Sequence, residues 1–226
     1  MTKGITRRKF AGAALVGAAA LAMKTSSTAK AGNILNGAKK MPKTALLLID
    51  VQNDYFPGGR FALPGMEEAG KTCARMLAAF RAKNYPIIHI HHEDTTKEAT
   101  FFLPGTVGAE FNKLVTPRAG EIRVLKHYPN AFRETNLKEI LDKAGIDTLV
   151  IGGAMSNMCV DAGTRAAADF GYNCAVAHDA CAAMDIDFNN IKVPAAQVHI
   201  AFMGALALGY ARVATANELL ADFKLA

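Results

Sequence analysis

The chain has 226 residues, of which 51% are hydrophobic and 20% charged. This composition predicts a globular protein with a substantial core and excludes a largely disordered chain. The formal net charge of +6 comes entirely from residues 1–31, and the rest of the chain balances 20 basic against 20 acidic residues, so no electrostatic argument favours a nucleic-acid partner.

The N-terminal segment has the pattern of an export signal. The pair Arg7-Arg8 precedes an apolar run rich in Ala and Gly, and Ala29-Lys30-Ala31 follows. We interpret residues 1–31 as a twin-arginine-type signal peptide cleaved after its last alanine, and residues 32–43 as a linker. The apolar run is shorter than the roughly 20 residues that span a bilayer. We therefore expect a periplasmic protein without stable membrane insertion after cleavage; an uncleaved anchor is the alternative.

From residue 44 onwards, short apolar runs alternate with longer segments of helical period. The expected strands are 45–49, 87–90, 122–125, 148–151, 174–177 and 212–214. The expected helices are 67–83, 134–144, 157–170, 195–208 and 217–223. Continuous apolar runs are typical of parallel strands buried on both faces. We predict one α/β domain over 44–226, doubly wound, with a six-stranded parallel sheet and helices on both faces.

Residues 94–120 are too many for an ordinary connection, so we expect a functional loop there that contributes to specificity. This loop contains Phe101 and Phe102. Together with Phe132, they are candidates to line a partly apolar substrate pocket; a plain core position is the alternative for each.

Three polar residues stand at or just beyond the ends of predicted strands, where open α/β sheets bind their ligands. Asp50 follows the first strand, Lys126 the third, and Cys159 lies a few residues after the fourth. Taken singly, an Asp there is more often a turn residue, a Lys is usually solvated and a Cys is usually core. Together they form a candidate catalytic set.

The set makes chemical sense for nucleophilic catalysis. A helix capped by Ser156 or Asn157 would place Cys159 in its first turn, where the helix dipole and a neighbouring ammonium favour thiolate over thiol. Asp50 would accept the thiol proton and return it to a leaving group, while Lys126 holds both charges in place. Backbone N–H groups of the glycine-rich turn before the helix would supply an oxyanion hole.

Three motifs over residues 44–226 resemble those of the isochorismatase-like cysteine hydrolases, a superfamily that also contains nicotinamidases, N-carbamoylsarcosine amidases and ureidoacrylate amidases. They are LLIDVQNDY at 47–55, KHYPNAF at 126–132 and GAMSNMCV at 153–160. The resemblance implies that Asp50 is the general base, that Lys126 completes a triad and that Cys159 is the nucleophile.

The resemblance also implies details that no spacing rule shows. The peptide bond between Ala154 and Met155 is expected to be cis, and the backbone N–H groups of Met155 and Cys159 are the expected oxyanion donors. We expect hydrolysis of an amide or ureido C–N bond of a small molecule through a thioester, without a cofactor. Homo-oligomers are common in this superfamily, so a homo-oligomer is expected as well.

Differences between this sequence and the better-known members of the superfamily narrow the range of reactions that we expect. Nicotinamidases carry a D-x-H…H metal site after the second strand, and this pattern is absent here. His89 and His91 share a strand face and are alternative metal ligands, but a structural or substrate-contacting role is favoured, so no metal is predicted. Isochorismatases cleave a vinyl ether and do not need the thiol. Because Cys159 is retained, C–N hydrolysis is favoured over vinyl-ether hydrolysis and over a non-catalytic binding role.

Other residues carry weaker signals. The four cysteines are scattered through predicted helices, strands and loops without metal-ligand spacing, so free thiols are expected rather than disulfides. His127 and Tyr128 either orient substrate or face solvent. Asp179 is interpreted as structural, and His199 as a packing or interface residue.

Overall fold

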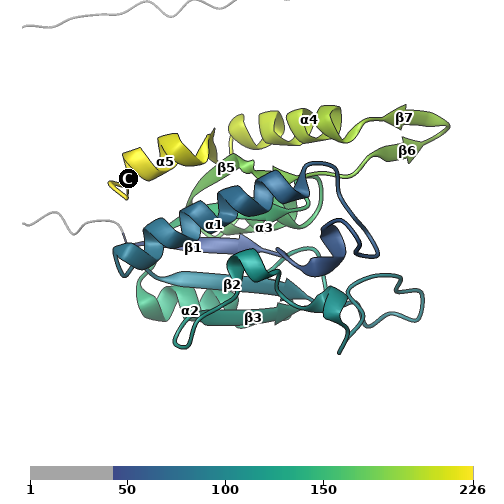
Figure 1. Cartoon of the computed structure of the whole chain (residues 1–226). Helices are drawn as coiled ribbons and strands as arrows, with labels where there is room; N and C mark the ends of the chain where they lie inside the picture. Colours follow the sequence, from purple (N-terminus) through teal and green to yellow (C-terminus); the bar gives the residue numbers. More distant parts are fainter. Residues whose placement is uncertain (1–42, 226) are drawn as a thin grey trace, which may run out of the picture. The chain divides into compact units, whose positions relative to one another are not determined.

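The computed structural model describes residues 43–225, so the predicted signal peptide and nearly all of the predicted linker lie outside the described residues. Its central sheet has the strand order β3-β2-β1-β4-β5-β8, and every neighbouring pair is parallel (Figure 1). The strands are β1 (Thr44–Ile49), β2 (Ile87–His92), β3 (Ile122–Lys126), β4 (Thr148–Ala154), β5 (Asn173–Ala182) and β8 (Arg212–Ala214). The six-stranded parallel sheet is confirmed.

Within residues 43–225, five α-helices cover the sheet. They are α1 (Met66–Ala82), α2 (Leu137–Ala144), α3 (Cys159–Asp169), α4 (Ala195–Ala207) and α5 (Ala216–Asp222). Helices α1 and α5 contribute to one core cluster together with Leu46 and Leu48 of β1. Helices α2, α3 and α4 contribute to a second cluster together with Leu47 and Ile49. Alternate residues of a strand point to opposite faces, so β1 is buried on both sides, as its continuous apolar run predicted.

The two-stranded antiparallel hairpin β6 (Ile186–Phe188) and β7 (Ile191–Val193) was not predicted. Each strand has only three residues, too few for a periodicity signal. The Asn189-Asn190 pair is the sequence signal that could have indicated this hairpin. Both residues have positive φ, as a type I′ turn requires. Figure 1 shows the hairpin projecting beyond the end of α4.

The long loop after β2 is anchored on the segment that follows β1. The segment after β1 contains the short 3₁₀ helix η1 (Asn53–Tyr55). The long loop contains two more, η2 (Val107–Ala109) and η3 (Lys113–Val115). The amide of Gln52 donates to the carbonyls of His92 and Ala109, at 2.8 and 2.7 Å. The loop is thereby tied to the ends of two strands. In residues 43–225, no helix combines the length and apolar character needed to cross a membrane.

Candidate active site

The candidate site lies where the strand order reverses. The chain moves outward from β1 through β2 to β3, and then returns to the other side of β1 with β4. Ligands of open α/β sheets bind at such a switch point, at the carboxyl ends of the strands. Asp50 directly follows β1, Lys126 ends β3 and Cys159 begins α3 beyond β4.

Lys126 joins the three predicted residues. Its Nζ lies 2.7 Å from Oδ2 of Asp50 and donates to Sγ of Cys159 at 3.2 Å. Asp50, Lys126 and Cys159 are 0%, 1% and 3% exposed. A buried charge needs a partner, and here the ammonium and the carboxylate are each other's partner, with the thiol in contact.

His92 also belongs to this group, although no motif in the sequence pointed to it. It is the last residue of β2 and pairs in register with Lys126 on β3. Its Nδ1 lies 3.1 Å from Nζ of Lys126 and 4.0 Å from Oδ2 of Asp50. Because an ammonium only donates, Nδ1 must accept and the neutral ring carries its proton on Nε2. The signal that could have found His92 is its position at the end of a neighbouring strand.

Asp50, His92 and Cys159 form a cluster whose ligand atoms lie within 4.8 Å of one another, the spacing of a possible metal site. Lys126 Nζ is within 3.2 Å of both Cys159 Sγ and His92 Nδ1 and 2.7 Å from the Asp50 carboxylate. The ammonium therefore stands where a cation bound to these atoms would stand. A metal ion would have to displace a buried, ion-paired lysine, so the donor set does not fit a metal.

The electrostatics of Cys159 differ from the prediction. Burial, and after it the negative charge of Asp50, raise the pKa of the Cys159 thiol from its ordinary value of 9.0 to about 12, although Lys126 acts in the opposite direction. The pKa of Lys126 is lowered by burial but raised overall, because Asp50 and Cys159 outweigh that effect. The prediction that the helix end and Lys126 would favour thiolate over thiol was wrong, because the pKa of the thiol is raised and not lowered. The dipole of a helix end and one ammonium do not overcome desolvation together with an adjacent carboxylate.

The start of α3 differs as well. Its N-cap is Met158, which makes no side-chain capping bond, so neither Ser156 nor Asn157 caps the helix as predicted. Cys159 still lies in the first turn. The hydroxyl of Ser156 bonds instead to Ala182 and His199.

The turn that leads into Cys159 has backbone N–H groups without acceptors in the described part of the chain. The Ala154–Met155 peptide bond is cis, as the resemblance implied. The N–H groups of Ser156, Met158 and Val160 are hydrogen-bonded to backbone carbonyls. The N–H groups of Met155, Asn157 and Cys159 have no hydrogen-bond acceptor within residues 43–225, and they include both expected oxyanion donors. An unpaired N–H next to a nucleophile is what binding of an oxyanion requires.

The predicted aromatic residues lie in two different places. Phe102 is fully buried and its ring centroid lies 4.6 Å from that of Tyr55 and 5.8 Å from that of His92. Phe101 lies 5.0 Å from Phe102 in the same cluster. Phe101 and Phe102 therefore reach the neighbourhood of the triad through Tyr55 and His92.

Phe132 packs elsewhere. Its ring contacts are Phe170 at 5.3 Å and Tyr172 at 6.2 Å, which follow the C-terminal end of α3, whereas Cys159 is at the N-terminal end. These contacts give Phe132 a core role, and its contact with substrate stays a prediction.

Asp54 of the first motif positions Phe102. It is 1% exposed, and its two oxygens accept from the backbone N–H groups of Arg60 and Phe102 at 3.0 and 2.6 Å. A Cβ at Gly108 would overlap the Asp54 carboxylate, so the loop backbone packs directly on it. The carboxylate thus connects η1 to the aromatic residues beside the site.

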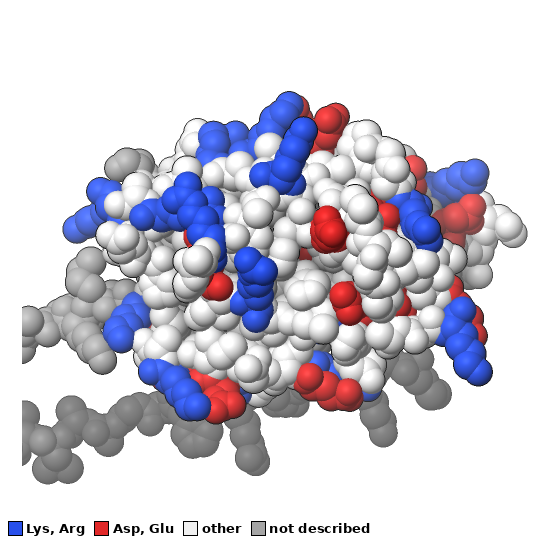
Figure 2. All heavy atoms as spheres, turned by 60° about the horizontal axis from the view of Figure 1, so that its bottom comes forward, with Lys and Arg blue, Asp and Glu red and all other residues white. Residues whose placement is uncertain are grey.

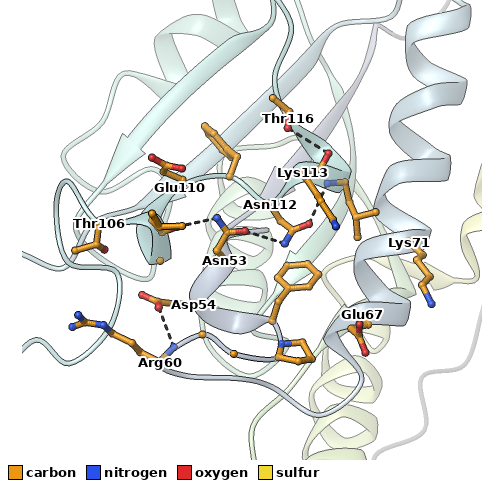
Figure 3. A pocket seen from close by; sticks show the side chains of 18 residues that line it. Asn53, Asp54, Arg60, Glu67, Lys71, Thr106, Glu110, Asn112, Lys113 and Thr116 are labelled. Carbon is orange, nitrogen blue, oxygen red and sulfur yellow. Dashed lines mark hydrogen bonds between the residues drawn. The ribbon is translucent and has the colours of Figure 1, made fainter.

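A pocket of about 1050 Å³ lies on the outer side of this arrangement and contains none of the triad residues (Figure 3). Its polar side chains bond mainly within the protein. Asn53 donates to the carbonyl of Val107 at 2.8 Å, and Asn112 donates to Asn53 at 3.0 Å. The pocket is therefore a hollow around a structural hydrogen-bond network.

The two alternative metal ligands have structural contacts. His89 is fully buried, and its Nε2 lies 2.9 Å from Glu121. His91 packs edge-on against Phe111 at 5.1 Å. Neither histidine belongs to the cluster of possible ligands around Cys159. Their favoured structural role accounts for these contacts.

The residues with weaker signals in the sequence make contacts within the protein. Nδ1 of His127 lies 2.8 Å from the carbonyl oxygen of Glu93, and Tyr128 stacks under the Arg133 guanidinium. Asp179 accepts from the N–H of Ala216, the structural role predicted for it. All four cysteines of the chain are buried and free, as predicted. One face shows basic and acidic side chains interspersed, in agreement with the balanced charge of residues 32–226 (Figure 2).

The chain and its fold are similar to known proteins. Residues 44–218 match the family model of the isochorismatase domain. The uncharacterised isochorismatase family protein YddQ of Bacillus subtilis is 44% identical over 177 residues, which cover 78% of this chain and 98% of YddQ. A crystal structure of an isochorismatase-type hydrolase from Oleispira antarctica is 55% identical, with a TM-score of 0.77 over 80% of this chain and 97% of the other.

More distant relatives have names that state an activity. The secreted isochorismatase effector Isc1 of Verticillium dahliae is 38% identical over 63% of this chain and 74% of its own. Maleamate amidohydrolase of Pseudomonas putida is 30% identical over 61% and 71% of the two chains. Streptothricin hydrolase of Streptomyces noursei is 32% identical over 63% of this chain and 50% of its own.

Proposed function

The chain belongs to the isochorismatase family of hydrolases, and we propose that it cleaves the C–N bond of a small amide, urea or carbamate through a thioester on Cys159. One observation carries the proposal: a single buried ammonium, that of Lys126, contacts both the carboxylate of Asp50 and the thiol of Cys159. This arrangement places a nucleophile, a base and a charge that stabilises both in one site.

In the proposed first half-reaction, Asp50 takes the proton of Cys159 as Sγ attacks the substrate carbonyl carbon. The raised pKa of the thiol favours transfer of this proton to Asp50 during the attack. The N–H groups of Met155 and Cys159 donate to the oxyanion. Asp50 then gives the proton to the leaving nitrogen, the C–N bond breaks and a thioester remains.

In the second half-reaction, the Asp50 carboxylate removes a proton from water as the water oxygen attacks the thioester carbon. Collapse of the second tetrahedral intermediate breaks the C–S bond and releases a carboxylic or carbamic acid. The proton on Asp50 returns to the departing sulfur. Lys126 remains protonated throughout and holds the carboxylate and the sulfur together.

The substrate class is supported by maleamate amidohydrolase among the relatives and by the aromatic residues near the site. The test is a panel of maleamate, streptothricin and N-carbamoyl amino acids, with release of ammonia or product measured by coupled assay or mass spectrometry. Cys159→Ala is expected to lose at least about 1000-fold in kcat, with unchanged circular dichroism. Cys174→Ala, which removes a thiol remote from Lys126, is the matched control and should keep its activity.

Vinyl-ether hydrolysis is the second candidate, because a relative with 38% identity is named as an isochorismatase effector. Isochorismate therefore belongs in the same panel. Turnover of isochorismate that survives Cys159→Ala, with no turnover of any amide, would replace the C–N proposal.

Export and self-association remain proposals on other grounds. Export rests on the Arg7-Arg8 pair and the Ala29-Lys30-Ala31 site, and N-terminal sequencing of the protein from a periplasmic fraction tests cleavage after Ala31. Self-association rests on the family resemblance, and light scattering of the purified chain tests it.

A further inference from the structure

The segment that carries the nucleophile is held by two elements outside the triad. Between the end of β4 and the start of α3, Ser156 contacts the end of β5 and helix α4. Its backbone N–H donates to the carbonyl of Ala182 at 2.8 Å. Its hydroxyl lies 3.1 Å from the same carbonyl and 2.8 Å from Nδ1 of His199.

The directions of these bonds follow from the groups present. The carbonyl oxygen of Ala182 only accepts, so the hydroxyl of Ser156 donates its single proton to it. The hydroxyl oxygen then accepts at its lone pairs, and the proton between Ser156 and His199 belongs to Nδ1 of the histidine. His199 is thus a donor to Ser156.

This Ser–His pair is not a second nucleophile and base. Ser156 is completely buried, and its proton is directed at a carbonyl. A base would have to accept that proton, whereas Nδ1 of His199 donates. The pair therefore holds backbone in place and performs no chemistry on a substrate.

The held backbone is the part that the proposed reaction uses. Ser156 stands directly after Met155 and three residues before Cys159, the two residues whose N–H groups are the expected oxyanion donors. The carbonyl of Met155 accepts from the N–H groups of Met158 and Val160, so a shift at Ser156 moves the whole turn. Misplacement of reacting groups by about 1 Å can cost about 100-fold in rate.

We propose that His199 is a positioning residue: its Nδ1–H bond to Ser156 sets the placement of the Met155 and Cys159 donors. This inference rests on the proposed function. It assigns to α4, which contributes nothing to the triad, a direct connection to the turn in which the oxyanion forms.

Three substitutions at one position separate hydrogen bonding from packing. Asn places an amide N–H close to the position of Nδ1, Gln reaches toward the position of Nε2 instead, and Ala removes the donor. For the best substrate of the panel, His199→Ala and His199→Gln are expected to lower kcat by about 10- to 100-fold, with KM changed less than about threefold. His199→Asn is expected to recover kcat to within about threefold of wild type. His178→Asn, at a ring 6.3 Å from His199, is the control and should leave kcat unchanged.

A second measurement needs no substrate. Hydrogen–deuterium exchange of the peptide spanning residues 154–160, read by mass spectrometry, should be at least about tenfold faster in His199→Ala and His199→Gln than in wild type and His199→Asn. If wild type hydrolyses nothing in the panel, the proposed function fails while this measurement still tests the role of His199. Equal exchange in all four proteins, or an Asn variant as impaired as the Ala variant, would overturn the positioning role.

Discussion

The ammonium of Lys126 lies 2.7 Å from the carboxylate of Asp50, and both side chains are almost completely buried. Lys126 ends β3 and Asp50 follows β1, with β2 between these strands, so the two charges meet at the carboxyl ends of the strands. Such a pair depends on both partners, because removal of one leaves the other desolvated and uncompensated.

Lys126→Met is therefore expected to destabilise the protein by about 3–5 kcal/mol, since it leaves the Asp50 carboxylate buried without a cation. Urea unfolding followed by circular dichroism measures this loss. Lys138→Ala is the control, because its ion pair with Asp142 is about half exposed and should contribute less than about 1 kcal/mol. Equal losses in both variants would contradict a tightly paired buried lysine.

Asp50→Asn should make Cys159 more reactive toward iodoacetamide. The negative charge of Asp50 raises the pKa of the thiol, so its removal lowers that pKa and increases the thiolate fraction at a given pH. Each unit of pKa is worth about tenfold in thiolate. The rate of Cys159 alkylation at pH 8 is read by peptide mass spectrometry, with Asp94→Asn at the surface as control. A slower reaction in Asp50→Asn would show that the carboxylate acts mainly as a base toward the resting thiol.

Stability should fall at alkaline pH because buried thiols must ionise on unfolding. Burial raises the pKa of Cys181 to about 12 from an ordinary value of 9.0. Its contribution is complete below pH 9 and is lost as the pH rises through 12, at up to about 1.4 kcal/mol per pH unit. Between pH 8 and pH 10.5, Cys181→Ala should lose less free energy of unfolding than wild type, by up to about 2 kcal/mol. The comparison uses urea unfolding of each protein at both pH values, and identical losses would refute the assignment.

Gly153→Ala should be strongly destabilising, by about 2–5 kcal/mol. Gly153 has φ of +128°, and a Cβ there would overlap the carbonyl oxygen of Ile49 on β1. The matched control is Gly171→Ala, which also has positive φ but no atom within 4 Å of the added carbon, and should cost about 1 kcal/mol. Thermal unfolding of both variants measures the difference; a control as unstable as Gly153→Ala would mean that φ alone, and not the close approach of β1 and β4, sets the cost.

Much of the fold could be predicted because its strands are continuous apolar runs separated by helical periods. The run Leu46–Ile49 is buried on both faces of the sheet, as such runs predict. The hairpin around Asn189-Asn190 escaped because three-residue strands have no measurable period. The extension of β5 to Ala182 escaped because Asp179 and its neighbours interrupt the apolar pattern.

The sequence indicated which residues form the site better than it indicated their contacts and pKa values. Asp50, Lys126 and Cys159 follow strands, and strand ends converge in a parallel sheet. His92 was missed because it is the second of four consecutive polar residues, 91–94, at the end of the strand, and only its register with Lys126 shows which of them faces Asp50 and Cys159. Serine is a residue type that often caps a helix, yet the hydroxyl of Ser156 contacts α4 and β5, which are distant from it in the sequence.

The alternation of strands and helices, the polar residues that end the strands and the family motifs around them are all visible in the sequence. These are local properties of periodicity and spacing. Packing of the sheet and its helices creates the burial that raises the pKa of the Cys159 thiol, places Lys126 at the centre of a cluster that otherwise has metal-ligand spacing, and brings His199 to Ser156. Each of these depends on burial and on distances between segments that the chain order does not specify, and both arise only when the sheet and its helices pack together.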